Sequence, residues 1–293
     1  MSRKYLKNLP VIGPAIKSVM SFFRTLKDRK NNVLLYRRNK KFIEPTGVLQ
    51  NANVGKRCFI LACGPSINTQ DLTALSKECS ISVSNFFVHP DFAKIHPEYH
   101  IFAGSHDPIT DAQMVSWLKS AEKHFPSDQK VVLSIMDKYL IDQFNLFKKQ
   151  KVYYYHLGGG GMNTSKDISF TGFVPTIGGI AHIAMCLGLY LGSKEMYLLG
   201  VDHDWLLHLG ESRHFYKENE SELVKGGYVE GPAKKERDLE NDFAASVTTW
   251  KGYKKIREYA RKRGVRIWNS TPGSLLDVFP RKSLKDALDE KKS

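Results

Sequence analysis

Short apolar runs alternate with amphipathic patterns along most of the chain, and this alternation constrains the fold more than any other feature. The apolar runs predict strands at 57–63, 79–84, 99–103, 130–135, 151–156, 195–200 and 265–268. Three- and four-residue spacings of apolar residues predict helices at 69–77, 111–123, 137–149, 177–191 and 243–263. Such alternation predicts an α/β fold, a Rossmann-like and mainly parallel sheet with helices on both faces.

The first predicted strand stops at a Gly64-Pro65-Ser66 corner, and the later strands also end in small or polar residues. In a doubly wound sheet, ligands bind outside the carboxyl ends of the strands. Small residues let backbone N–H groups approach a phosphate, and amide or hydroxyl side chains can recognise a base and a sugar. We therefore expect a substrate- and nucleotide-binding site built from Gly64, Pro65, Ser66, Asn85, Asp107, Thr176, Gly178, Gly179, Asp202, Ser270, Thr271 and Ser274.

The glycines in this set leave some alternatives open. The spacing after Gly64 is not GxGxxG and no P-loop lysine follows, so neither a standard dinucleotide site nor a P-loop is supported. Gly178 and Gly179 open a predicted helix, which suits either an anion site or close packing of the helix on the sheet.

Residues 203–242 are polar and aromatic with poor periodicity, which is typical of a lid or binding segment when it interrupts a domain. His203 and His214 lie in this segment, and a histidine there can act as a general base near neutral pH. Packed or exposed histidines without a chemical role are the alternative. Arg213 and Lys217 flank His214 and suit contact with phosphate.

The Asp202-His203-Asp204 sequence matches the D-x-D pattern with which metal-dependent sugar transferases hold a divalent ion on a diphosphate. Motifs of three residues also occur by chance. We expect no cofactor. In a metal-dependent alternative, Asp202 and Asp204 would be ligands of Mg²⁺ or Mn²⁺.

The net charge of +14 is concentrated at the amino-terminal end. Residues 1–41 contain twelve Lys or Arg and one acidic residue, which leaves 32 basic and 29 acidic residues for the rest of the chain. A nearly neutral body argues against nucleic acid as a partner. Apolar residues between 11 and 26 recur with helical spacing and basic residues lie between them, so we expect an amphipathic helix on an anionic membrane surface. Packing on the body, or a homo-oligomer contact, is the alternative.

These patterns predict three parts of the chain. Residues 1–45 form the basic membrane-surface segment, 46–281 the Rossmann-like domain with its lid at 203–242, and 282–293 a charged tail. The longest uncharged apolar stretch is shorter than the roughly 18 residues of a spanning helix. Four cysteines without C-x-x-C spacing fit a reducing compartment. We expect a cytoplasmic protein at the inner face of the cytoplasmic membrane.

Several motifs occur in an order that resembles a known family. They are the GPS corner, the asparagine after the second strand, the glycines before a helix, LGSKEMYLLGVD, and WNSTPGSLL near the end. The chain resembles the bacterial sialyltransferases of glycosyltransferase family 42, the Campylobacter type, over roughly 57–205 and 255–280. It is also similar to a related superfamily of flagellin-glycosylating proteins that includes an archaeal pterin diphosphokinase.

This resemblance implies a transferase that uses a CMP-linked nonulosonic acid such as CMP-sialic acid without a metal. It implies that the Gly64–Ser66 corner approaches the nucleotide phosphate and ribose, that Asn85 contacts the donor near its phosphate, and that the glycines near 178 line the donor sugar. Asp107 stands where the family has an Asn-Pro, and the 270–274 loop would reach the base or ribose. His203 and Asp204 stand where the family has a tyrosine, and Tyr216 matches a second tyrosine that assists the leaving phosphate. The family's base histidine has no counterpart after residue 214, so that role would fall to His214 or His203.

The sequence features are compatible with three functions. The first is a glycosyltransferase that modifies a cell-surface glycan or a lipid-linked acceptor by direct displacement. This function accounts for both the nucleotide-sugar site and the membrane-surface segment. The second is a metal-dependent diphosphotransferase that uses Asp202 and Asp204. The third is a non-catalytic nucleotide-binding scaffold.

Overall fold

The computed structural model describes residues 30–158, 160–208, 211, 213–217, 221–225 and 238–289. The chain falls into two compact units, Met1–Lys41 and Phe42–Ser293. Residues 30–43 are helical, whereas the amphipathic helix predicted between 11 and 26 lies outside the described residues. None of the described helices is long and apolar enough to cross a membrane.

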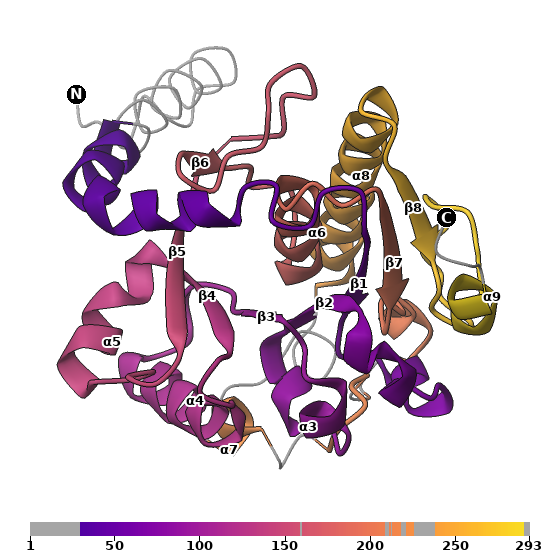
Figure 1. The fold of residues 1–293 in the computed structure, drawn as a ribbon, viewed down its shortest axis with the longest axis horizontal. Helices are drawn as coiled ribbons and strands as arrows, with labels where there is room; N and C mark the ends of the chain where they lie inside the picture. The colour runs from indigo at the N-terminus through magenta and orange to yellow at the C-terminus, as the bar shows by residue number, and fades with distance from the viewer. Residues whose placement is uncertain are drawn as a thin grey trace, which may run out of the picture. The chain divides into compact units, whose positions relative to one another are not determined.

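The second unit is built on one parallel sheet of eight strands, which Figure 1 shows between two layers of helices. The structure confirms the seven predicted strands as β1 (Arg57–Leu61), β2 (Cys79–Val83), β3 (Tyr99–Ile101), β4 (Lys130–Ser134), β5 (Lys151–Leu157), β7 (Glu195–Leu199) and β8 (Arg266–Asn269). The sheet also contains β6 (Phe173–Val174), which is too short to be read from a pattern of alternation. Every strand pair is parallel.

The strand order is β6-β5-β4-β3-β2-β1-β7-β8. The chain therefore starts in the middle of the sheet, moves outward to β6, and returns to place β7 on the other side of β1. This reversal creates a switch point between β1 and β7, where the connections leave the carboxyl edge in opposite directions. A ligand site is expected outside the carboxyl ends of these two strands.

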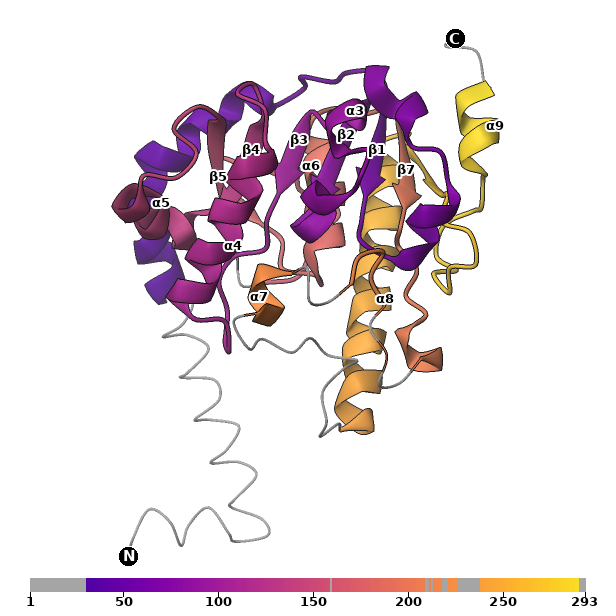
Figure 2. The same ribbon diagram turned by 90° about the horizontal axis from the view of Figure 1, so that it is seen from below.

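Helices cover both faces of the sheet, as the sequence predicts (Figures 1 and 2). On one face lie α6 (Ile180–Tyr190) and α8 (Leu239–Lys262), and on the other lie α3 (Phe92–Ile95) and α4 (Asp111–His124). Four residues of β1 and four of β7 are buried, because helices on both faces exclude water from the middle strands. The remaining short elements are η1 (Glu44–Leu49), η2 (Pro65–Thr69), η3 (Thr73–Lys77), η4 (Ser84–Val88), η5 (Ile135–Asp137), α5 (Lys138–Phe144), η6 (Trp205–Leu207), α7 (Glu222–Lys225) and α9 (Leu284–Asp289).

Two predicted helices differ from the structure for local reasons. In place of a helix at 69–77 there are two short 3₁₀ turns, because the Asp71 carboxylate accepts hydrogen bonds from the Thr73 backbone (3.0 Å) and hydroxyl (2.6 Å). Such a side-chain turn competes with helical hydrogen bonds. The helix predicted at 137–149 ends at Phe144, because Asn145 adopts a left-handed conformation with φ 53°. Within the predicted tail, α9 buries Leu284 and Ala287.

Candidate active-site cleft

A cleft of about 450 Å³ opens at the carboxyl edge of the sheet, at the switch point. Its walls come from the residues that follow β1, β2, β3 and β7, from the first residues of α6, and from described parts of the 203–242 segment. The sequence-predicted residues in its lining are Gly64, Asn85, Gly179, Asp202, His203, Asp204, Arg213, His214 and Tyr216.

The Gly64-Pro65-Ser66 corner holds Asp202 in the cleft wall. The backbone N–H and hydroxyl of Ser66 donate to the two carboxylate oxygens of Asp202 at 3.0 and 2.8 Å. The Gly64 N–H donates to the carbonyl of Gly200 at 2.8 Å, which joins the end of β1 to the end of β7. Burial raises the pKa of Asp202, and the two Ser66 bonds act against that rise. Gly64 and Asp202 line the cleft, whereas Pro65 and Ser66 lie behind it.

Asn85, at the end of β2, ties the 203–242 segment to the sheet. Its amide nitrogen donates to the hydroxyls of Tyr216 (2.9 Å) and Ser221 (3.0 Å). Its amide oxygen accepts from the indole N–H of Trp117 on α4. The amide is therefore satisfied on both sides within the protein, and its role is to position Tyr216 at the cleft.

Helix α6 begins at the cleft. Gly178 has φ +150°, and a Cβ there would lie 2.4 Å from the ring of His182, so glycine is required where the chain turns into the helix. Gly179 is the N-cap, and Gly179, Ile180 and Ala181 line the cleft. The first N–H groups of a helix have no partner within the helix, and they carry its positive end. This end of α6 is thus suited to a phosphate or a carboxylate. Thr176 and Gly178 themselves lie outside the lining.

His203 follows β7 and rests on a buried tyrosine. A hydrogen bond of 2.7 Å joins its Nε2 to the hydroxyl of Tyr253 on α8, and Tyr253 in turn stacks on His182 with ring centroids 3.8 Å apart. Burial lowers the pKa of His203 to about 4 and that of His182 to about 4. Both imidazoles are therefore neutral near pH 7, and His203 presents a neutral ring to the cleft.

These two histidines make stability depend on pH. Their folded pKa lies below the unfolded value, so the unfolded chain takes up protons first and stability is lost as pH falls from about 6.5 towards 4. Between about pH 7 and about pH 5 each histidine is expected to contribute a loss of about 2 kcal/mol in the free energy of unfolding. Urea unfolding at both pH values measures this loss. A His182→Gln variant should show a smaller difference than wild type, and His124→Gln, on the exposed end of α4, the same difference. An equal loss in all three proteins would contradict this assignment.

Arg213 and His214 enter the cleft from the 203–242 segment. Arg213 forms a two-point ion pair with Asp204, with its Nε 3.3 Å from Oδ1. The His214 ring stacks on Tyr216 with centroids 4.9 Å apart and an interplanar angle of 10°. Because Asn85 holds Tyr216, the imidazole of His214 has a fixed platform in the cleft at which α6 begins.

The two aspartates of the D-x-D sequence are already engaged. Ser66 binds Asp202, and Arg213 binds Asp204. Across the described ranges, no three His, Cys, Asp or Glu side chains gather into a group that could hold a metal ion. A divalent ion on Asp202 and Asp204 would compete with Ser66 and Arg213 for the carboxylate oxygens.

The 270–274 loop braces the end of β7. The Thr271 hydroxyl donates to the Leu198 carbonyl at 3.0 Å and accepts from the Val201 N–H at 3.1 Å, while the Ser274 hydroxyl donates to the Val201 carbonyl at 2.7 Å. Ser270, Thr271 and Ser274 are buried and are absent from the cleft lining. Asp107 is exposed and also lies outside the lining.

Several residues of the cleft were missed by the sequence analysis. Trp117, Ser221 and Leu223 belong to helix or loop patterns that carry no motif. Tyr253, which holds the lining residue His203 from outside the lining, lies in the middle of α8. His106 follows β3, so its position after a strand is a signal in the sequence, but the predicted site contains its neighbour Asp107 instead. Ile180 and Ala181 would act through their backbone N–H groups, which do not depend on the side chain, so the sequence does not mark these residues.

No protein-family model matches the chain, and no curated protein matches it. Among solved structures it is similar to the sialyltransferase CstII from Campylobacter jejuni, in complex with a substrate analogue, cytidine-5'-monophosphate. The two chains are 15% identical, the match covers 78% of this chain and 86% of that chain, and the TM-score is 0.46. A likeness of this size carries no argument about donor, acceptor or mechanism, and those questions rest on the cleft itself.

Proposed function

We propose that this protein is a glycosyltransferase that uses a CMP-activated nonulosonate, such as CMP-sialic acid, as donor. The observation that carries the proposal is the meeting of three features in one cleft at the switch point: the positive end of α6, the guanidinium of Arg213, and the imidazole of His214. A CMP-nonulosonate carries two anionic groups near its reacting carbon, the phosphate and the sugar carboxylate. The α6 N–H groups supply one place, and the guanidinium N–H groups of Arg213 that do not meet Asp204 supply the other. The order of sequence motifs supports the same class of donor.

The reaction would be a direct displacement at the anomeric carbon. The acceptor hydroxyl loses its proton to His214 as its oxygen bonds to the anomeric carbon, and the bond from that carbon to the phosphate oxygen breaks, releasing CMP. Charge develops on the leaving phosphate, where the α6 N–H groups and the Tyr216 hydroxyl can stabilise it. His203 is the second candidate for the base, but its Nε2 is engaged by Tyr253 and its pKa of about 4 makes it a weak proton acceptor.

Nucleotide release from a panel of donors tests this function. We expect release of CMP from a CMP-nonulosonate in the presence of glycan acceptors, with no release from UDP- or GDP-sugars. EDTA should leave the rate unchanged. Loss of the rate in EDTA would favour the diphosphotransferase with Asp202 and Asp204 as metal ligands, and no turnover with any donor would favour a nucleotide-binding scaffold.

The acceptor is proposed to be a surface glycan or a lipid-linked glycan at the inner face of the bacterial membrane. The support is the charge of residues 1–41, which contain twelve of the 44 basic residues of the chain. Each Lys or Arg near an anionic surface adds about 1 kcal/mol of attraction.

Deletion of residues 1–41 is expected to abolish binding to anionic vesicles and to leave turnover of a soluble acceptor within about twofold of wild type. The unit from Phe42 to Ser293 contains the sheet and the whole cleft, so its activity should survive. Vesicle sedimentation with phosphatidylserine measures the binding, and neutral phosphatidylcholine vesicles are the control. Binding that persists after the deletion would refute this role of the segment.

A further inference from the structure

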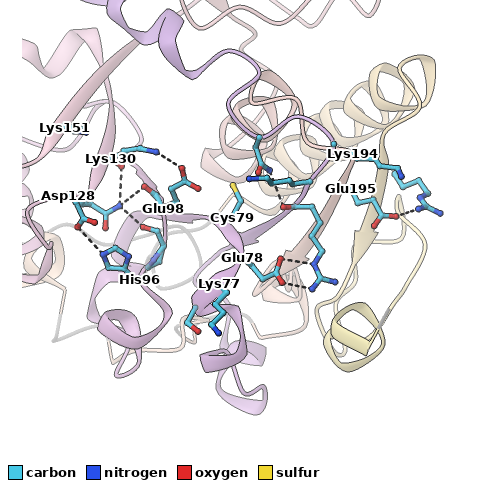
Figure 3. Close-up of a pocket in the computed structure, with 18 residues that line it drawn as sticks. Lys77, Glu78, Cys79, His96, Glu98, Asp128, Lys130, Lys151, Lys194 and Glu195 are labelled. Atoms are coloured by element: carbon cyan, nitrogen blue, oxygen red, sulfur yellow. Dashed lines mark hydrogen bonds and ion pairs between the residues drawn. The ribbon is translucent and has the colours of Figure 1, made fainter. Parts of the chain in front are cut away.

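A second and larger cavity lies at the opposite edge of the sheet, where the strands begin. It has a volume of about 800 Å³ and shares no lining residue with the active-site cleft. Figure 3 shows its side chains, which come from the amino ends of β1, β2, β4, β5, β7 and β8 and from the loops before them. We call this cavity the amino-edge groove.

Positive charge is in excess in the amino-edge groove. Seven Lys or Arg side chains and four carboxylates line it. Every carboxylate already has a partner: Glu78 pairs with Arg57 (2.7 Å), Glu98 with Lys130 (2.6 Å), Asp128 with His96 (3.2 Å), and Glu195 with Arg266. The remaining cations, which form no ion pair within the described part of the chain, are Lys56, Lys77, Lys151 and Lys194.

Four of the lysines stand opposite one another in two pairs. Lys130 and Lys151 are direct register partners on β4 and β5. The Lys194 N–H donates to the Lys56 carbonyl at 2.8 Å, one residue before β1 and β7 begin their register. Like charges directly opposite each other on neighbouring strands are destabilising. An anion between Lys56 and Lys194 would offset that repulsion, and in the other pair, where Glu98 already meets the Lys130 ammonium, an anion would pair with Lys151.

The spacing of the two pairs indicates the size of the ligand. Side chains alternate between the faces of a strand while register partners share a face, and the register from β1 through β5 places both pairs on one face. The pairs are four strand spacings apart across the sheet, or about 19 Å, and Lys56 lies four residues before Ile60, which is in register with Lys130, so the offset along the strands adds about 13 Å. A ligand that meets both pairs must be extended and carry several anionic groups.

The rest of the lining distinguishes among polyanions. The Gln129 side chain is 2% exposed, and its amide oxygen has no hydrogen-bond partner among the described residues. This oxygen and the four carboxylates can accept hydrogen bonds from hydroxyl groups. No Phe, Tyr or Trp is among the described residues of the lining, so nucleic-acid bases would have no ring to stack on. A concave groove also fits a chain better than a flat bilayer.

We propose that the amino-edge groove binds an acidic polysaccharide, a chain of carboxylated sugars whose carboxylates lie between the lysine pairs and whose hydroxyls meet Gln129 and the neighbouring carboxylates. This site goes beyond the proposed transferase activity and does not depend on it. Occupied by such a chain, the groove would hold acidic glycan at the edge of the sheet opposite the active-site cleft.

Binding of labelled polygalacturonate oligomers to the full chain, followed by fluorescence anisotropy, tests the proposal. Affinity should increase with oligomer length until the oligomer spans both lysine pairs, and neutral dextran should not bind. The double variant Lys151→Glu/Lys194→Glu should weaken binding at least tenfold. The matched control Lys254→Glu/Lys285→Glu makes the same change in net charge at exposed positions outside the groove, and it should change binding less than twofold. If the reversed variant fails to fold, Lys151→Gln and Lys194→Gln, which remove one charge of each pair, take its place.

Three outcomes would overturn the proposal. In the first, the control variant weakens binding as much as the groove variant, which would indicate non-specific attraction. In the second, free galacturonate binds as tightly as the long oligomers. In the third, phosphatidylserine vesicles or single-stranded DNA lose binding in the groove variant while polygalacturonate does not. CMP release should be unchanged in the groove variant, so failure of this site and failure of the transferase activity are measured separately.

Discussion

Replacement of His214 by alanine is expected to lower turnover about 100-fold, with little change in the affinity for the donor. The imidazole of His214 is the proposed base for the acceptor hydroxyl, and general base catalysis typically contributes 10²- to 10⁴-fold. The ring stacks on Tyr216 and lines the cleft, so its loss removes the proton acceptor without removing a buried partner of the core. Steady-state kinetics that separate kcat from KM measure the effect.

Two controls make this result specific to proton transfer. Added imidazole should restore part of the activity of His214→Ala, because a small base can enter the space that the ring occupied. His124→Ala, at the exposed end of α4, should retain full activity. Unchanged turnover in His214→Ala would remove it as the base and direct the same experiment to His203.

The second large effect concerns Gly64 and is expected in stability. A Cβ on this residue would lie 1.9 Å from a carboxylate oxygen of Asp202 and 2.6 Å from the carbonyl oxygen of Gly200. Neither contact can be relieved by turning a flexible side chain, because one is backbone and the other is held by Ser66. Overpacking of this kind typically costs about 1–3 kcal/mol, and we expect Gly64→Ala to reach the upper end of that range.

Urea unfolding of Gly64→Ala measures this loss, and Gly161→Ala is the matched control. A Cβ on Gly161 meets nothing within 4 Å, so the control should change stability by less than about 0.5 kcal/mol. Gly64→Ala should also lose activity, since the clash moves Asp202 and the end of β7. A Gly64→Ala protein as stable as the control would show that the corner is not packed against Asp202.

The strands could be predicted because burial determines which residues can stand within each strand. A strand covered by helices on both faces must be apolar along most of its length, as Phe59, Ile60 and Leu61 are in β1. β6 escaped prediction because two residues cannot show a pattern. The end of α5 escaped because Asn145 takes a left-handed conformation that its sequence neighbours do not reveal.

The candidate site could be predicted only where position in the fold decides the role. Residues directly after β1, β2 and β7 reach the cleft because parallel strands end at one edge, which is why Gly64, Asn85 and Asp202 were found. The loop after β8 also ends at this edge, but its hydroxyls turn inward to the carbonyls of Leu198 and Val201. Hydroxyl groups satisfy buried carbonyls as readily as they bind a ligand, and residue type alone does not separate these uses.

Contacts between residues that lie far apart in the sequence could not be predicted either. The pairing of Ser66 with Asp202 spans 136 residues, and that of Asn85 with Tyr216 spans 131. Neither pair has a spacing that a local pattern can express. The lysine pairs of the amino-edge groove likewise become visible only once the strand order places Lys194 beside Lys56.

A crystal structure of the protein with CMP would locate the nucleotide. We expect the nucleotide to lie in the carboxyl-edge cleft, with phosphate oxygens about 3 Å from the backbone N–H groups of Gly179, Ile180 or Ala181. Nucleotide density in the amino-edge groove, or a carboxyl-edge cleft that stays empty at saturating CMP, would contradict it.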